Sequence, residues 1–162
     1  MATITLKNAL HIPQESNSIS PWGNNLTLAY NFTTNASGVI VSSDKSTAVA
    51  DGDVIRLGVL PAGLKLIDMT RIISDAFATS TTDKIGFAYV DGVDSTAVPQ
   101  DDDYFSAATT SAATAITHKT AVTAPVILPK EAYLILTSAG AAQSAAGVMD
   151  ILIHGVQTMR GQ

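Results

Sequence analysis

The feature that most constrains the fold is a series of short segments in which apolar and polar residues alternate. The segment 54–60 follows the turn signal Asp51-Gly52-Asp53, and the segment 82–90 ends at the reverse-turn pair Asp91-Gly92. Successive side chains of a strand point to opposite faces, so this alternation predicts strands with one buried face. Regular turn signals between such segments are typical of an all-β domain.

The same pattern predicts eight or nine short strands and no long helix. The predicted strands cover 3–6, 26–31, 39–41, 54–60, 64–73, 82–90, 116–122, 132–136 and 148–156, and a short apolar run at 126–128 ends at Pro129. The remaining segments 99–103, 106–115 and 138–147 are expected to be loops, with a short helix as the alternative for 106–115. Twelve of the fourteen acidic residues are Asp, which prefers turns and caps to helices.

Residues 64–73 are the one place where a helix competes with a strand. Leu64, Ile67 and Arg71 fit helical spacing, but Pro61 and Gly63 just upstream and the β-branched residues favour a strand. Both of its faces are partly apolar, so we expect a central strand that is covered on two sides.

These elements predict an all-β fold, an antiparallel β-sandwich that is jelly-roll-like, or a barrel, with an extended N-terminal arm. A length of 162 residues suits one such body. We expect residues 1–25 to form an N-terminal strand and the arm, and residues 26–162 to form the body.

The arm is rich in Pro and Asn and has little regular patterning. Trp22 is its one large anchor, and Trp is enriched at the centres of interfaces. The residues that we expect to bind a partner are the apolar and proline residues of this segment: Ile12, Pro13, Ile19, Pro21 and Trp22.

Charge and composition restrict the partners. Nine basic residues are scattered among fourteen acidic ones, for a net charge of −5, whereas proteins that neutralise phosphates need clustered Lys and Arg. We therefore expect no nucleic-acid partner. The longest apolar runs are too short to span a bilayer, the first residues lack a signal-peptide pattern, and there is no Cys. We expect a protein made in a cytoplasm, with no membrane partner.

The sequence offers weak signals for chemistry. His11, His118 and His154 lack metal-ligand spacing, and there is no nucleophile elbow, phosphate loop or dinucleotide fingerprint. The best candidate for a cation site is the run Asp101-Asp102-Asp103, with Asp91 and Asp94 upstream, because oxygen-rich loops can hold Ca²⁺. No metal or cofactor is predicted, a solvated loop is preferred, and no enzymatic activity is expected.

Several segments resemble a known family. The stretch Gly52-Asp53-Val54-Ile55-Arg56-Leu57-Gly58-Val59-Leu60-Pro61-Ala62-Gly63, the stretch 85–92, the site Asp103-Tyr104-Phe105 and the stretch 129–134 are similar to segments of head decoration, or cement, proteins of tailed bacteriophages. The resemblance covers roughly residues 50–156. It implies a β-sandwich that binds the outer surface of a phage head across capsomer junctions, and it implies no catalytic residues.

The resemblance also implies partners and a location. The partners would be the major capsid protein and further copies of this chain, with a homotrimer favoured and a homodimer as the alternative. The location would be the outer capsid surface of the virion, after assembly in the host cytoplasm.

Two other functions remain open from the residues. A carbohydrate- or receptor-binding module of a phage tail or fibre would need exposed aromatic side chains, for which Trp22 and Tyr104 are the candidates. A small hydrolase would need Asp residues from the turns to converge in a desolvated pocket.

Overall fold

The alternating segments form ten strands in the computed structural model, which describes residues 1–6 and 25–158. In chain order they are β1 (Thr3–Thr5), β2 (Asn25–Thr34), β3 (Val54–Leu60), β4 (Leu64–Asp75), β5 (Thr82–Tyr89), β6 (Asp101–Thr110), β7 (Ala115–His118), β8 (Val126–Ile127), β9 (Ala132–Ala139) and β10 (Gly147–Gln157). The described part of the chain has no helix long and apolar enough to cross a membrane.

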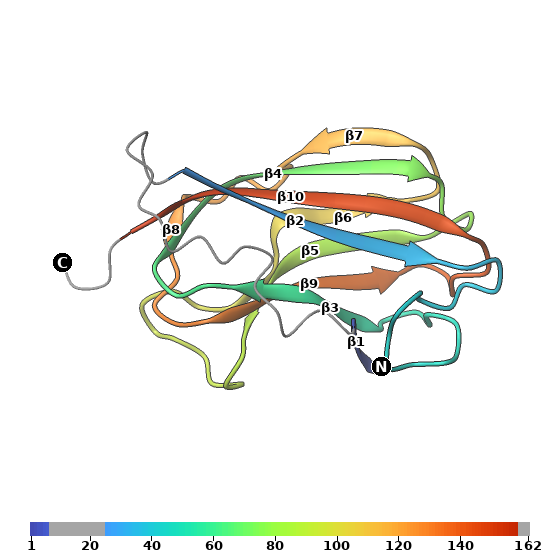
Figure 1. Ribbon diagram of the computed structural model, residues 1–162, viewed down its shortest axis with the longest axis horizontal. Helices are drawn as coiled ribbons and strands as arrows, with labels where there is room; N and C mark the ends of the chain where they lie inside the picture. The colour runs from blue at the N-terminus through green and yellow to red at the C-terminus, as the bar shows by residue number, and fades with distance from the viewer. Residues whose placement is uncertain (7–24, 159–162) are drawn as a thin grey trace.

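The strands form two sheets that face each other (Figure 1). The first sheet has the order β1-β3-β9-β5-β6, and the second has the order β2-β10-β4-β7 with β8 beside β4. Every pair is antiparallel except β1 with β3, which is parallel. The predicted all-β sandwich is confirmed, and the two separate sheets decide between the sandwich and the barrel.

The core lies between the inner faces of the two sheets. The first sheet contributes alternate residues such as Ile55 and Phe87, and the second contributes Leu28 and Ile151; each is at most 1% exposed. Their burial removes apolar surface from water, at about 25 cal/mol per Å². The alternation in sequence therefore corresponds to the division between core and outer faces.

The predicted loop at 99–103 and the predicted loop or helix at 106–115 are wrong over most of their length. Residues 101–110 form the edge strand β6. Its pairing with β5 is irregular, since Ile85 lies opposite Ser106 and Phe87 lies opposite Asp101. A step of two residues along β5 thus corresponds to a step of five residues along β6, which is a bulge in β6. The bulge interrupts the alternation of apolar and polar residues from which strands are predicted.

The strand predicted at 64–73 is confirmed, and the competing helix is wrong. Coverage on two sides is not found, because Ile67 remains 42% exposed. A register shift in the pairing of β4 with β10, beside His154 and Gly155, places Ile67 on the open face. The outer face of the second sheet is therefore partly apolar.

The N-terminal strand is part of the core. Ile4 is fully buried, and the backbone N–H of Ala2 donates a hydrogen bond to Asp53 Oδ1 at 2.7 Å. Leu6 forms an antiparallel bridge with Ser43 on the other side of β1. Residues 1–6 are thus held on both sides, at the foot of the first sheet (Figure 1).

Candidate functional site

The predicted partner-binding residues lie outside the described part of the chain. All five belong to the segment 7–24, before β2: Ile12, Pro13, Ile19, Pro21 and Trp22. Their role stays a prediction. The candidate sites that follow come from residues 1–6 and 25–158.

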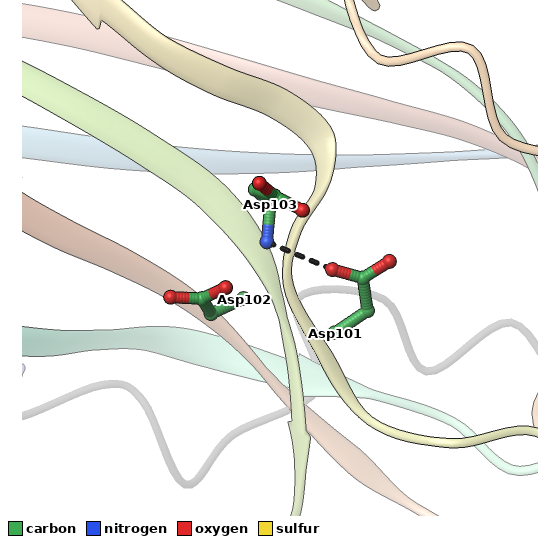
Figure 2. Close-up of side chains that lie close together, drawn as sticks. All are labelled: Asp101, Asp102 and Asp103. Atoms are coloured by element: carbon green, nitrogen blue, oxygen red, sulfur yellow. Dashed lines mark hydrogen bonds between the residues drawn. The ribbon is translucent and has the colours of Figure 1, made fainter.

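The carboxylates of Asp101, Asp102 and Asp103 gather at the start of β6 (Figure 2). Each residue offers one carboxylate oxygen, and these three oxygens all lie within 4.8 Å of one another. The backbone N–H of Asp103 donates a hydrogen bond to Asp101 Oδ1 at 3.1 Å. The bulge in β6 brings them together, because consecutive residues of a regular strand would point to opposite faces.

Gly86 permits this arrangement. A Cβ at Gly86 would collide with the backbone of Asp101 and Asp102, which passes directly over it. The absent side chain therefore gives the start of β6 room to lie against β5.

Crowding of the carboxylates has an electrostatic effect. Hydrogen bonding to Asp101, together with burial and the charge of Asp101, raises the pKa of Asp103 above its usual value. Lys84 lies 3.4 Å from Asp102 and offsets part of the negative charge. The cluster presents oxygen ligands of the kind that divalent cations prefer. Asp102 is exposed, however, and geometry alone does not assign a metal site.

The other two acids of the predicted cation site do not join the cluster. Asp91 forms an ion pair with Lys130 at 2.7 Å, and this hydrogen bond lowers the pKa of Asp91. Asp94 accepts hydrogen bonds from the backbone N–H groups of Ser95 and Gln100. Asp91 and Asp94 therefore each stabilise their local loop and do not contribute to the acidic cluster.

The two described histidines meet on the outer face of the second sheet. His154 lies within hydrogen-bond distance of Thr27 Oγ1 and Thr70 Oγ1, at 3.2 Å and 3.1 Å, and His118 lies 3.4 Å from the same Thr70 hydroxyl. The spacing of the two histidines in the sequence does not predict that they lie close together. Their proximity results from the strand order β2-β10-β4-β7, which places their strands on either side of β4. The hydroxyls satisfy the rings, as expected of structural histidines.

Sequence reasoning missed two buried carboxylates. Asp53 accepts from the backbone N–H groups of Ala2 and Ala50 and pairs with Lys45, and Asp83 pairs with Arg71 at 2.9 Å. The sequence placed Asp53 in the predicted turn 51–53 and Asp83 in the predicted strand 82–90, with no role assigned to either. Because each is satisfied by its own cation, neither forms a converging carboxylate pair of the kind a hydrolase needs.

The aromatic side chains of the described chain are all buried. They are Tyr30, Phe32, Phe77, Phe87, Tyr89, Tyr104, Phe105 and Tyr133, and none exceeds 7% exposure. Tyr104, named above as a candidate for stacking on a sugar, is packed edge-on against Phe87 and Phe105. The described surface therefore offers no aromatic platform for a carbohydrate.

Large aliphatic side chains are exposed instead. Ile67 on β4, Ile116 on β7 and Ile127 on β8 are 42%, 69% and 47% exposed, and we call them the outer-face isoleucines. Ile116 lies opposite Ile72 in the pairing of β7 with β4, and Ile127 lies opposite Lys65. All three lie on the outer face of the second sheet, and exposed apolar groups that share a face are typical of surfaces that bind another protein.

These observations define the class of protein as a two-sheet β-sandwich with a partly apolar outer face. No protein-family model matches the sequence, and no curated protein matches it. Among solved structures, the chain is similar to one from the capsid of Ralstonia phage GP4, with a TM-score of 0.62 and 18% identity, over 97% of this chain and 99% of that chain.

A second similar structure is a chain from the capsid asymmetric unit of cyanophage Pam1. The TM-score is 0.60 at 14% identity, over 84% of this chain and 86% of that one. The protein thus has the fold of chains found in phage capsids.

Proposed function

We propose that this protein is a virion structural protein that decorates the outer surface of a tailed-phage capsid and stabilises the shell. The observation that carries the proposal is the match to a capsid chain over almost the full length of both chains, 97% of this one and 99% of that one. A chain of similar size from a phage capsid thus shares this fold from end to end.

Physical reasoning links such a sandwich to shell stability. A protein that binds across capsomer junctions, and only when they are closed, stabilises the assembled state by mass action. Self-association, as a trimer or a dimer, would add avidity because one oligomer grips several capsid subunits. The net charge of −5 favours solubility of the free protein during assembly in the cytoplasm.

The outer-face isoleucines are the proposed contact with the major capsid protein. They are exposed aliphatic groups on β4 and on the two short strands that pair with it, and their burial would favour association. Acidic residues on the same face, such as Asp68 and Asp150, would orient the contact more than strengthen it.

The arm residues Ile12, Pro13, Ile19, Pro21 and Trp22 form a second proposed contact. Trp22→Ala is expected to weaken capsid binding and to leave the free energy of unfolding unchanged. A loss of folding stability in this variant would place Trp22 in the core of the chain and contradict the proposal.

The test is cosedimentation with phage heads that lack this protein. We expect the wild-type chain to pellet with the heads and to raise the temperature at which they release their contents. The variant Ile116→Lys should bind less tightly, and Ala107→Ser, on the exposed part of β6, is the matched control. Absence of binding by the wild-type chain would contradict the proposed function.

A further inference from the structure

The open edges of the two sheets are protected unequally. Edge strands expose unpaired backbone groups, and proteins protect them by short length, charge, proline, bulges or covering segments. In the described residues, β1 has three residues and is bridged to Ser43 on its far side, and β7 has four residues. The edge strand β6 carries three Asp residues, is bulged, and its Phe105 carbonyl already accepts from Thr120 and Ala121.

Within residues 1–6 and 25–158, the remaining edge strand, β2, has none of these protections over most of its length. It has ten residues, Asn-Leu-Thr-Leu-Ala-Tyr-Asn-Phe-Thr-Thr, with no charged residue and no proline. Its ten pairs with β10 run from Asn25 to Thr34 without a register shift. A long, regular and uncharged edge of this kind is a template for another strand.

The unused backbone groups of β2 can be assigned. The carbonyl of Thr33 accepts from the N–H of Val41 at 2.9 Å, on the side away from β10. Backbone groups alternate in direction along a strand, so Asn25, Thr27, Ala29 and Asn31 also point away from β10. Within the described residues, no backbone group bonds to these four, and Val41 closes the edge only at Thr33.

We propose that the β2 edge pairs with the β2 edge of a second copy of this chain, antiparallel, about a two-fold axis at Leu28. A strand without charge or proline can pair with itself, since no like charges meet and no N–H is missing. An axis at Leu28 places Thr27 opposite Ala29 of the second copy, and Asn25 opposite its Asn31. The backbone N–H and C=O groups of all four open residues then form hydrogen bonds across the interface. An axis at Ala29 would instead bring Asn25 onto Thr33, which Val41 already occupies.

This contact joins the second sheets of two copies into one continuous sheet. The interface is isologous, as in most two-fold dimers. It leaves the outer-face isoleucines, on the far strands β4, β7 and β8, free for a different partner. Of the two oligomers that the sequence left open, this contact favours the dimer.

The first test is the mass of the protein in solution, measured by sedimentation equilibrium over a range of concentrations. We expect a monomer–dimer equilibrium for the wild type and a dimer weakened about tenfold or more in Ala29→Lys, because the two lysines would lie diagonally across the axis on one face and repel each other. Ala29 is exposed, so this lysine is compatible with the folded monomer. Ile116→Lys, on the same face at the opposite edge, is the matched control and should dimerise normally.

The second test uses the absence of cysteine from the sequence. Facing residues of a hydrogen-bonded antiparallel pair have Cα atoms about 5.5 Å apart, within disulfide range, whereas diagonal residues are about 7–8 Å apart or more. A mixture of Thr27→Cys and Ala29→Cys chains should therefore form a 27–29 disulfide under oxidation. Either variant alone should cross-link much more slowly.

Several outcomes would overturn the proposal. They are a monomeric wild type, a trimer, an oligomer lost in Ile116→Lys but not in Ala29→Lys, or cross-linking of the single variants as fast as of the mixture. Binding to phage heads distinguishes a failure of this inference from a failure of the proposed function. Ile116→Lys should lose affinity for heads while it stays dimeric. Ala29→Lys should bind heads as a monomer, without the gain in affinity that avidity gives the dimer.

Discussion

The guanidinium of Arg71 on β4 donates a hydrogen bond from Nη1 to Oδ1 of Asp83 on β5, at 2.9 Å, and so joins the two sheets inside the core. Both residues are almost fully buried, at 1% and 3% exposure. Arg71 Nη2 also donates to the carbonyl of Thr110 at 2.6 Å, at the end of β6. One side chain thus connects three strands.

Removal of one partner of this pair should be costly. Asp83→Ala is expected to lower the free energy of unfolding by about 3–5 kcal/mol, because it leaves the Arg71 charge buried without its counter-ion. The double variant Arg71→Met, Asp83→Ala should lose much less than the sum of the losses in the single variants Arg71→Met and Asp83→Ala. Denaturant titrations of all four proteins measure the coupling, and additive losses would contradict the role of the pair.

The same pair predicts a dependence of stability on pH. Burial raises the pKa of Asp83 to about 6, and the attraction of Arg71 opposes this only in part. Between the unfolded value of 3.8 and about 6, the folded chain therefore holds more protons than the unfolded chain. By linkage, the contribution of Asp83 to the free energy of unfolding is fully present below pH 4 and is lost as the pH rises through 6.

Asp83→Asn isolates this contribution. The amide keeps an acceptor for Arg71 but does not titrate, so the difference in unfolding free energy between wild type and variant should change between pH 4 and pH 7. Unfolding curves at four or five pH values measure it. A difference that stays constant over this range would show that Asp83 remains ionised throughout.

Asp53 should hold the N-terminal strand in place. Its carboxylate accepts from the N–H groups of Ala2 and Ala50, at 2.7 Å and 2.9 Å, and pairs with Lys45. Burial favours the protonated acid, but these hydrogen bonds together lower the pKa of Asp53 below its usual value. Asp53→Ala is expected to cost about 1–3 kcal/mol, since it removes the buried carboxylate that accepts all of these hydrogen bonds.

Hydrogen exchange locates that effect. The amides of residues 3–5 should exchange faster in Asp53→Ala, while those of β10 stay protected. Asp75→Ala is the control, because Asp75 is exposed and lies at the end of β4, in the other sheet. Equal exchange at residues 3–5 in wild type and Asp53→Ala would contradict this role.

Gly86→Ala should disturb the acidic cluster. The added Cβ would collide with the backbone of Asp101 and Asp102, so the start of β6 must move. We expect a larger loss of stability than the roughly 1 kcal/mol expected for Gly92→Ala, where φ is +70° but nothing lies within 4 Å of the added atom. Thermal unfolding of both variants tests the order, and equal losses would contradict the close approach.

Local alternation carried most of the information about the strands. The segments 54–60, 82–90 and 148–156 were predicted within one residue of their observed limits, because apolar and polar residues alternate along each of them. β6 was missed where its bulge breaks the alternation, and Ser106–Thr110 has only small side chains that indicate no face. For the acidic cluster, the run of Asp was visible, but the bulge that gathers it was not.

The sequence by itself determined that this chain forms short strands with one apolar face, because alternation and turn residues act between near neighbours. Only the tertiary structure decided which strands pair, and so which residues meet. It placed Arg71 against Asp83, His118 and His154 around Thr70, and β2 at an open edge. Those meetings depend on backbone hydrogen bonds and packing between residues far apart in the chain, which no local pattern encodes.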